Sequence, residues 1–301
     1  MQFDPHDVYV GKDIGGREVH VTPDLVARYT AGTGDDHPWY TQPSPFGGAV
    51  APALLLHSEV YRTLTWYLPN LIGNLHAKQE WEFFGPMLVG EIVRTHSTVV
   101  ERYRKRNRDY IVNEVLVTDA SGRWLQRSRT HQSFLAETPA DAHTDVVDKT
   151  REKRSDRRFD IGDDGGERLA SVSRHITVAM CEAFSGPEKN YHNDREMARV
   201  LGFPDIVVQG MMSICFVSEV MARAFGEGWW LGGKLTLNLV NVVWGDETIT
   251  TRAQVRAHEP EGRHTRVHVA VWGEKPDGTK TVIGTASALR DEPPHRFAGA
   301  N

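Results

Sequence analysis

Two stretches of the sequence follow the same plan. Residues 21–38 read VTPDLVARYTAGTGDDHP, and residues 176–190 read ITVAMCEAFSGPEKN. Each begins as a short helix-like segment and continues into a loop opened by a glycine. The two glycines, Gly34 and Gly186, lie 152 positions apart (186 − 34). This spacing is the first indication that the chain contains one plan twice.

Two further pairs of segments support the repeat. Gly90-Glu91 matches Gly245-Asp246 at a spacing of 155 (245 − 90). The turn at residues 119–122 matches the turn at residues 275–278, and alignment of Asp119 with Asp277 gives a spacing of 158 (277 − 119). Loop insertions produce a drift of this size. We therefore interpret the chain as an internal duplication.

Each copy predicts the same series of elements. A longer apolar helix follows the glycine-led loop, over Val50–Leu64 in the first copy and Val207–Phe225 in the second, and its composition is typical of a buried helix. Alternating segments come next and predict strands joined by turns. The fold class is therefore α+β, with a central helix wrapped by an antiparallel sheet in each copy. The predicted strands cover residues 91–100, 110–117, 124–134, 248–255, 264–272 and 281–289.

A highly charged segment separates the two copies. Residues 141–168 contain nine acidic and seven basic side chains and few large apolar ones. Such a segment buries too little apolar surface to offset its ordering entropy, so we interpret it as a solvated linker. The predicted organisation is a first domain over 1–140, a linker over 141–168 and a second domain over 169–301.

The overall composition excludes several classes of function. The net charge of −5 gives no positive field for nucleic acid, and no apolar run approaches the length of a membrane span. The N-terminal residues lack the pattern of a signal peptide. Cys181 and Cys215 are too few for a disulfide framework and are expected as buried thiols. We expect a soluble cytoplasmic protein.

The glycine-led loops resemble those of the MaoC-like enoyl-thioester hydratases. In that family a Gly-Asp-x-Asn-Pro-x-His loop precedes the central helix, and its Asp and His hold the water that adds to the acyl double bond. The first loop here reads GDDHPWY over residues 34–40, so Tyr40 stands where His is expected. The second reads GPEKNYH over residues 186–192, so Pro187 stands where Asp is expected. The resemblance covers nearly the whole chain outside the linker and implies two fused hotdog domains.

The resemblance implies acid–base chemistry on an enoyl or 3-hydroxyacyl thioester. Hydration needs a base for water, an acid for the α carbon and donors for the enolate oxygen. His192 is the first candidate for acid–base work, Glu188 for the second carboxylate and Asn190 for orientation, and Gly210 matches the start of the family's central helix. In the first copy Pro52 and Ala53 stand at that helix start, so the second copy is the better candidate. Asp35 and Tyr40 form a second, altered site or serve the structure.

A basic cluster at residues 102–108 suits the phosphates of coenzyme A, since arginine binds phosphate bidentately. Arg104, Lys105 and Arg106 are the candidates, and the alternative is an ordinary charged hairpin loop. Coenzyme A is expected as part of the substrate, with no other cofactor. No spacing of His and Cys predicts a metal site.

Two other functions stay open at this stage. With both loops altered, the fold could carry out a different elimination or cyclisation on a specialised substrate. It could also bind an acyl group without turnover. We expect a small-molecule thioester as the partner, no nucleic acid and no membrane, and the chain is a candidate homodimer. The sequence does not identify the acyl chain or its carrier.

Overall fold

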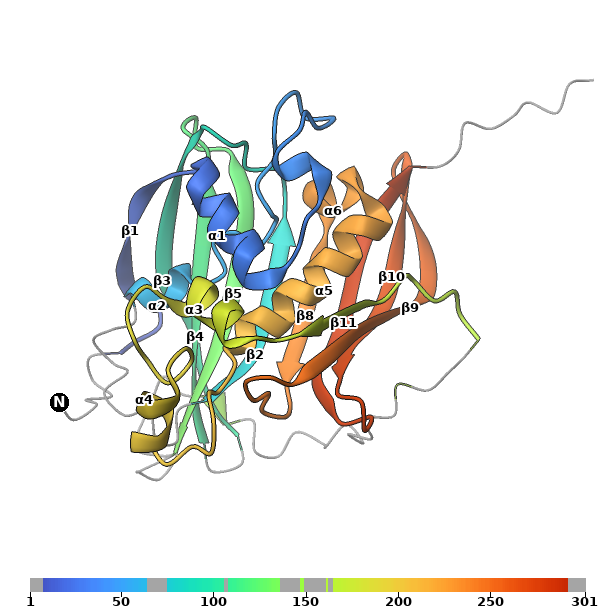
Figure 1. The fold of residues 1–301 in the computed structure, drawn as a ribbon. Coiled ribbons are helices and arrows are strands. Elements are labelled where there is room, and N and C mark those ends of the chain that lie inside the picture. The colour runs from blue at the N-terminus through green and yellow to red at the C-terminus, as the bar shows by residue number, and fades with distance from the viewer. Residues whose placement is uncertain are drawn as a thin grey trace, which may run out of the picture.

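A single strongly curved sheet runs through both halves of the chain (Figure 1). The computed structural model describes residues 8–63, 75–105, 108–135, 147–148, 161 and 165–291. The strand order is β1-β3-β4-β5-β2-β8-β11-β10-β9-β7, every neighbouring pair is antiparallel, and β6 pairs in parallel with β3. The strands are β1 (Asp13–His20), β2 (Leu75–Phe83), β3 (Ile92–Lys105), β4 (Arg108–Thr118), β5 (Trp124–Leu135), β6 (Val147–Asp148), β7 (Val172–His175), β8 (Lys234–Leu239), β9 (Thr248–Glu261), β10 (His264–Glu274) and β11 (Lys280–Asp291).

The two halves meet at the β2–β8 pair. Glu80 lies opposite Thr236, with Lys78 opposite Asn238 on one side and Glu82 opposite Lys234 on the other. A shift of 156 positions (236 − 80) exchanges the two outer pairs and maps Glu80–Thr236 onto itself, as a twofold relation between the halves requires. The sheets of the two copies thus join into one surface, which gives the two fused hotdog units that the resemblance implies.

Backbone hydrogen bonds correct the register of the repeat. The Gly90 N–H donates to the Val21 carbonyl, and the Asp246 N–H donates to the Ile176 carbonyl. Gly90 therefore corresponds to Asp246, not to Gly245, and the spacing is 156 (246 − 90). The predicted spacing was one residue short because Asp246 adopts φ 61°, a conformation that usually selects glycine, while Gly90 has φ 97°.

The strand–turn–strand units have the same spacing. The Gly122 N–H donates to the Asp119 carbonyl, and the Gly278 N–H donates to the Lys275 carbonyl. Asp119 thus corresponds to Lys275, at 156 positions (275 − 119), and the alignment of Asp119 with Asp277 was wrong. The predicted strands and the turns between them are confirmed.

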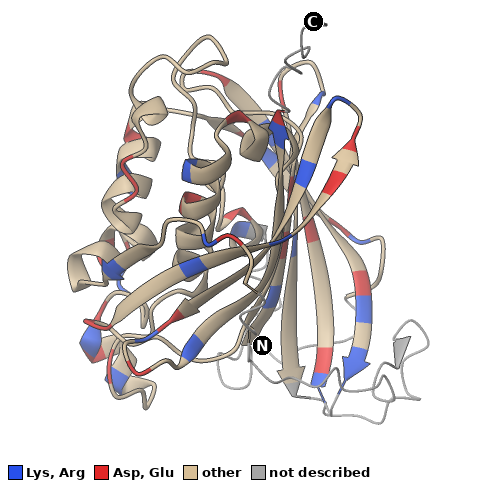
Figure 2. Cartoon of the chain, turned by 90° about the vertical axis from the view of Figure 1, so that its right-hand side faces the viewer, with Lys and Arg blue, Asp and Glu red and all other residues tan. Residues whose placement is uncertain are grey.

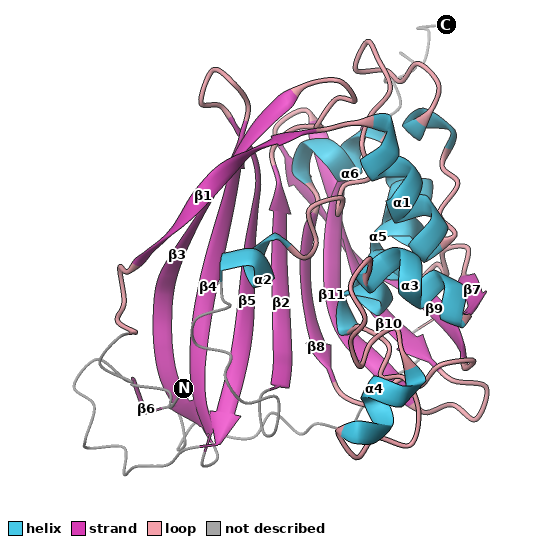
Figure 3. Ribbon diagram, turned by 60° about the vertical axis from the view of Figure 1, so that its left-hand side comes forward, coloured by secondary structure: helices cyan, strands magenta, loops and turns pink. Residues whose placement is uncertain are grey.

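The helices lie on one face of the sheet, mainly over the second half (Figure 3). The first-half helix α1 packs against α3, where a Cβ on Gly32 would lie 2.9 Å from the Phe184 Cβ. The central helix α5 is buried along most of its length and starts at Gly210, three residues later than predicted. The helices are α1 (Pro23–Thr33), η2 (Pro38–Tyr40), α2 (Glu59–Thr63), α3 (Val178–Ser185), α4 (Arg195–Val200), α5 (Gly210–Phe225) and α6 (Glu227–Gly232).

The first half does not form the continuous helix predicted over residues 50–64. Residues 53–58 form successive turns, closed by bonds such as the Leu55 N–H to the Pro52 carbonyl, and α2 follows with five residues. An apolar run does not by itself distinguish a buried helix from a series of turns. The Glu59 carboxylate accepts two bonds of 2.8 Å from Arg17 of β1 and one of 3.1 Å from Thr95 of β3. They tie this segment to one edge of the sheet, as the Arg174–Glu219 ion pair ties α5 to β7 at the other edge.

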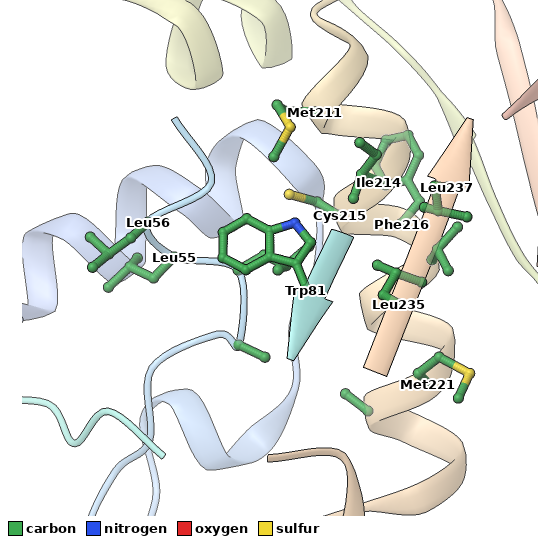
Figure 4. Close-up of a cluster of buried hydrophobic side chains, with 14 of the residues drawn as sticks. Leu55, Leu56, Trp81, Met211, Ile214, Cys215, Phe216, Met221, Leu235 and Leu237 are labelled. Atoms are coloured by element: carbon green, nitrogen blue, oxygen red, sulfur yellow. The ribbon is translucent and has the colours of Figure 1, made fainter. Parts of the chain in front are cut away.

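The core is continuous between the halves. Figure 4 shows the Trp81 indole of β2 between the first-half segment that carries Leu55 and Leu56 and the second-half helix α5 with Cys215. Both cysteines are buried free thiols, as predicted. Three tryptophans of this core, Trp81, Trp229 and Trp230, are at most 3% exposed.

Charged side chains of both signs lie along the strands (Figure 2). Arg129 pairs with Glu114 at 2.8 Å and Arg127 with Glu82 at 2.9 Å, so neighbouring strands neutralise one another. No helix in the described part of the chain is long and apolar enough to cross a membrane. Most of the predicted linker, residues 141–168, lies outside the described residues, and the domain limits stay a prediction.

Candidate active site

The first glycine-led loop closes on itself. Gly34 ends α1 in the left-handed conformation (φ 69°), and Asp35 follows with 2% of its surface exposed. The Tyr40 hydroxyl, itself buried, donates to the Asp35 Oδ2 at 2.6 Å. The backbone N–H of His37 donates to the other carboxylate oxygen at 3.3 Å. Tyr40 therefore occupies the expected histidine position and uses its hydroxyl to satisfy the buried carboxylate.

A second buried carboxylate faces this pair from α5. Glu219 is 1% exposed, and its Oε1 lies 2.7 Å from Arg174 and 2.8 Å from Arg223. Burial, and then the nearby Asp35 charge, raise the pKa of Glu219 to about 7. Burial also raises the pKa of Asp35, against the Tyr40 hydrogen bond and the Arg223 charge. This carboxylate–arginine cluster joins the first loop to the second-half helix.

The second loop places His192 where the first places Tyr40. The Val207 N–H donates to the Tyr191 carbonyl at 3.2 Å, and the Val50 N–H donates in the same way to the Trp39 carbonyl at 2.8 Å. His192 follows the Tyr191 carbonyl, and Tyr40 follows the Trp39 carbonyl. His192 and Tyr40 are thus equivalent across the twofold, at the predicted spacing of 152 (192 − 40).

The His192 imidazole has a fixed tautomer. Its Nδ1 lies 2.6 Å from the Val207 carbonyl oxygen, so Nδ1 carries the proton and Nε2 carries the lone pair. Burial lowers the pKa of His192 to about 4, against the effect of the carbonyl. The ring is therefore neutral near pH 7, and Nε2 can accept a proton.

Asn190 gives the second loop its shape. Its Oδ1 accepts the His192 backbone N–H at 2.9 Å, and its amide donates to the Ser185 and Glu188 carbonyls at 3.0 and 2.9 Å. Asn190 thus acts on the backbone of His192. The Glu188 side chain is exposed, one residue beyond Pro187. Its role as the second carboxylate stays a prediction, as do the roles of His192, Asn190, Asp35 and Tyr40.

The N-terminus of α5 follows directly on the residues that hold His192. Gln209, the N-cap residue, makes no side-chain cap, and the Met212 N–H donates to the Gln209 carbonyl at 2.8 Å, so the N–H groups of Gly210 and Met211 are the donors that remain at the helix start. A Cβ on Gly210 would lie 2.8 Å from the Leu239 side chain. Glycine at this position therefore lets the helix start pack against β8. The equivalent first-half residues are Pro52 and Ala53, and proline has no N–H to donate.

A chain of polar side chains that the sequence did not single out crosses from the second loop to the first half. The Ser185 hydroxyl donates to Gln209 at 3.2 Å, and the Gln209 amide donates to Ser58 at 3.4 Å. The Ser58 Oγ lies 2.6 Å from the Nδ1 of His57, whose ring stacks on Phe184 at 4.1 Å. Burial lowers the pKa of His57 to about 3. Only the twofold packing brings Ser58 and His57 beside the second loop.

The predicted phosphate-binding residues lie at the far end of β3. The Arg104 side chain is 7% exposed and forms a bidentate ion pair with Asp109, at 2.6 and 2.9 Å. Lys105 ends the strand, and Arg106 lies outside the described residues. Their role toward coenzyme A stays a prediction. Within the described ranges, no three His, Cys, Asp or Glu side chains gather as metal ligands.

Comparison with known proteins gives the class of the fold. A solved MaoC-like dehydratase shares 16% identity over 95% of this chain and 99% of its own, with a TM-score of 0.70. A MaoC-like dehydratase from Phytophthora capsici shares 14% over 96% and 98%, also with a TM-score of 0.70. A Mycobacterium tuberculosis protein described as a double hotdog shares 14% over 94% and 97%, with a TM-score of 0.63. The chain is therefore a double-hotdog protein.

The sequence itself matches a narrower group. Residues 8–126 match the family model of the FAS1-like dehydratase domain region. Together with the fold, this match confirms the resemblance to the MaoC-like hotdog family that the glycine-led loops predict. No curated protein matches the chain.

Proposed function

We propose that the protein is a hydratase or dehydratase of enoyl or 3-hydroxyacyl thioesters, with coenzyme A as the expected carrier. The observation that carries the proposal is the neutral, partly buried His192 imidazole. Its Nδ1 is fixed by the Val207 carbonyl, and it lies beside the uncapped start of α5. A hydration site needs a base of this kind next to donors for an oxyanion. The FAS1-like dehydratase match supports the reaction class.

In the hydration direction, the His192 Nε2 accepts a proton from water as the oxygen bonds to the β carbon. The electrons of the double bond move to the thioester oxygen, and N–H groups at the start of α5 stabilise the resulting enolate. The enolate collapses as the imidazolium returns its proton to the α carbon. Dehydration reverses these steps and releases water.

The first loop is less suited to this work. Its carboxylate, Asp35, already accepts the Tyr40 hydroxyl at 2.6 Å. Burial and the neighbouring carboxylate raise the pKa of Tyr40 well above 10, so this phenol is a poor acid near neutral pH. We therefore assign the main site to the second half.

Hydration of crotonyl-CoA, followed by the loss of enoyl absorbance, tests the proposal. His192→Ala should reduce kcat/KM by about 100-fold or more. His96→Ala, the same change at a side chain that is 55% exposed on β3, should leave kcat/KM unchanged. Because the neutral imidazole is the active form, kcat/KM of the wild type should stay level down to about pH 5 and fall toward pH 4. Wild-type rates in His192→Ala would remove His192 from the mechanism, and acyl-CoA binding without turnover would favour a binding module.

A further inference from the structure

The inner face of the first-half sheet carries polar side chains where the second half has apolar ones. Asn113, Thr130 and Gln79 lie side by side on β4, β5 and β2, and Val269, Ala286 and Leu235 take the same places on β10, β11 and β8. The next row repeats the contrast. Its first-half members are Ser97, Ser128 and Trp81, and their second-half equivalents are Ala253, Gly284 and Leu237.

Several of these polar groups are buried without a partner. Asn113 is 0%, Ser97 1% and Trp81 3% exposed. The Ser97 hydroxyl, the Trp81 Nε1 and both amide atoms of Asn113 make no hydrogen bond within the described structure. An unpaired buried amide destabilises a protein, and the second half uses valine at the same place without this cost. The polar groups of Asn113, Ser97 and Trp81 therefore indicate that something else binds them.

The two faces also differ in what covers them. Helix α5 lies over the second-half strands, and over the first half the described residues provide only turns and the five-residue α2 (Figure 3). Within the described residues, the polar rows thus occur on the face that is covered by the short α2 and turns and not by a long central helix.

A hydrogen-bonded network extends from the polar face to Tyr61 of α2. Thr130 donates to the Gln79 Oε1 at 2.8 Å, the same oxygen lies 3.0 Å from the His76 Nε2, and the His76 Nδ1 lies 3.0 Å from the Tyr61 hydroxyl. Burial lowers the pKa of His76 to about 4, so the network is uncharged.

We infer that the acyl group of the substrate carries a hydroxyl or keto oxygen, some carbons from the thioester, that Asn113 of β4 binds with Ser97 of the neighbouring strand β3. The inference rests on the proposed function, because it places the thioester end at His192. The two side chains supply an amide, which can donate and accept, and a hydroxyl, and these match an uncharged oxygen function. A plain alkyl chain would leave both of them unpaired and so bind less tightly.

Binding of non-reacting ligands tests this inference without turnover. Decanoyl-CoA would be compared with decanoyl-CoA esters that bear one hydroxyl or keto group at successive carbons beyond the fourth, by calorimetric titration. At least one oxygenated isomer should bind the wild type about tenfold more tightly than decanoyl-CoA. Asn113→Val should remove that difference. Asn238→Val is the matched control, because Asn238 lies on the opposite face of the joined sheet, and it should keep the difference.

The melting temperature of the ligand-free protein gives a second measurement beside the titration. Asn113→Val should raise the melting temperature of the ligand-free protein by about 2 °C or more, since it removes unpaired buried groups. Equal affinity for alkyl and oxygenated ligands would overturn the inference even with that rise, because water alone would then satisfy Asn113. Free decanoic acids with and without the oxygen separate the two proposals. If the free acids keep the preference and no CoA ester binds, the thioester function fails and the polar site stands.

Discussion

The loop at residues 34–40 and the loop at residues 186–192 occupy equivalent places in the twofold, and each keeps one member of the family's catalytic pair. The first keeps Asp35 and binds it with a tyrosine hydroxyl at 2.6 Å. The second keeps His192 and holds it neutral with a backbone carbonyl. We interpret this difference as a division of the family's Asp–His pair between the two halves. The first loop became part of a buried charge cluster, and the second kept the group that can accept a proton.

The inner faces of the two halves of the sheet also differ, in polarity and in what covers them. The second-half face is apolar and covered by α5, as expected of a stable core. The first-half face is polar and partly unpaired, and within the described residues only the five-residue α2 lies over it. In our proposal the first half thus provides the surface for the acyl group, and the second half provides the helix start for the oxyanion.

The largest expected effect on stability is a pH dependence at Glu219, the carboxylate of α5 that faces the first loop. The folded pKa of Glu219 is about 7, above its ordinary value of 4.5, so folding binds a proton between these two pH values. Its contribution is fully present below about pH 4.5 and is lost as pH rises through about 7, by on the order of 1–3 kcal/mol. Urea unfolding of wild type and Glu219→Gln at pH 4.5 and pH 8 measures this change. The stability of the variant relative to wild type should be greater at pH 8, and an equal difference at both pH values would show that Glu219 does not titrate in the cluster.

A smaller expected effect on stability tests the register of the repeat, in which Gly90 corresponds to Asp246. Gly90 and Asp246 occupy the same turn with φ of 97° and 61°. Gly90→Ala should reduce the free energy of unfolding by about 1–2 kcal/mol, because an L side chain is strained there. Asp246→Gly should gain at most a few tenths of a kcal/mol, because relief of strain is offset by loss of the exposed ion pair with Arg195. Thermal unfolding of both variants checks the pair, and a stable Gly90→Ala would contradict the assigned equivalence.

The repeat, the strands and α5 follow from sequence because they depend on local periodicity. Alternation identifies both hairpins of each half, and the apolar run at residues 207–225 identifies the central helix. The first-half helix was mispredicted because an apolar run does not show whether its residues form a helix or turns, and residues 53–58 form turns. The register was one residue short because Asp246 adopts a backbone conformation that the sequence suggested only for glycine.

The candidate site was only partly accessible from sequence. The loop spacing located His192, Asn190, Asp35 and Tyr40. It did not indicate that Tyr40 bonds to Asp35, or that Glu219 faces them from the other half. Ser58 and Gln209 meet across 151 positions (209 − 58) because the two halves lie side by side along the joined sheet. Superposing the two copies would have suggested these contacts, since each loop lies against the central segment of the other half.

The most direct test compares Asp35 and His192, the two residues that the loops retain from the motif of the resembling family, in one assay. Asp35→Asn and His192→Asn would be measured with the same enoyl-CoA, and their melting temperatures would establish that both variants fold. We predict that kcat/KM falls about 100-fold or more in His192→Asn and changes less than about threefold in Asp35→Asn. Loss of activity in Asp35→Asn with near wild-type rates in His192→Asn would contradict the account and assign catalysis to the first half.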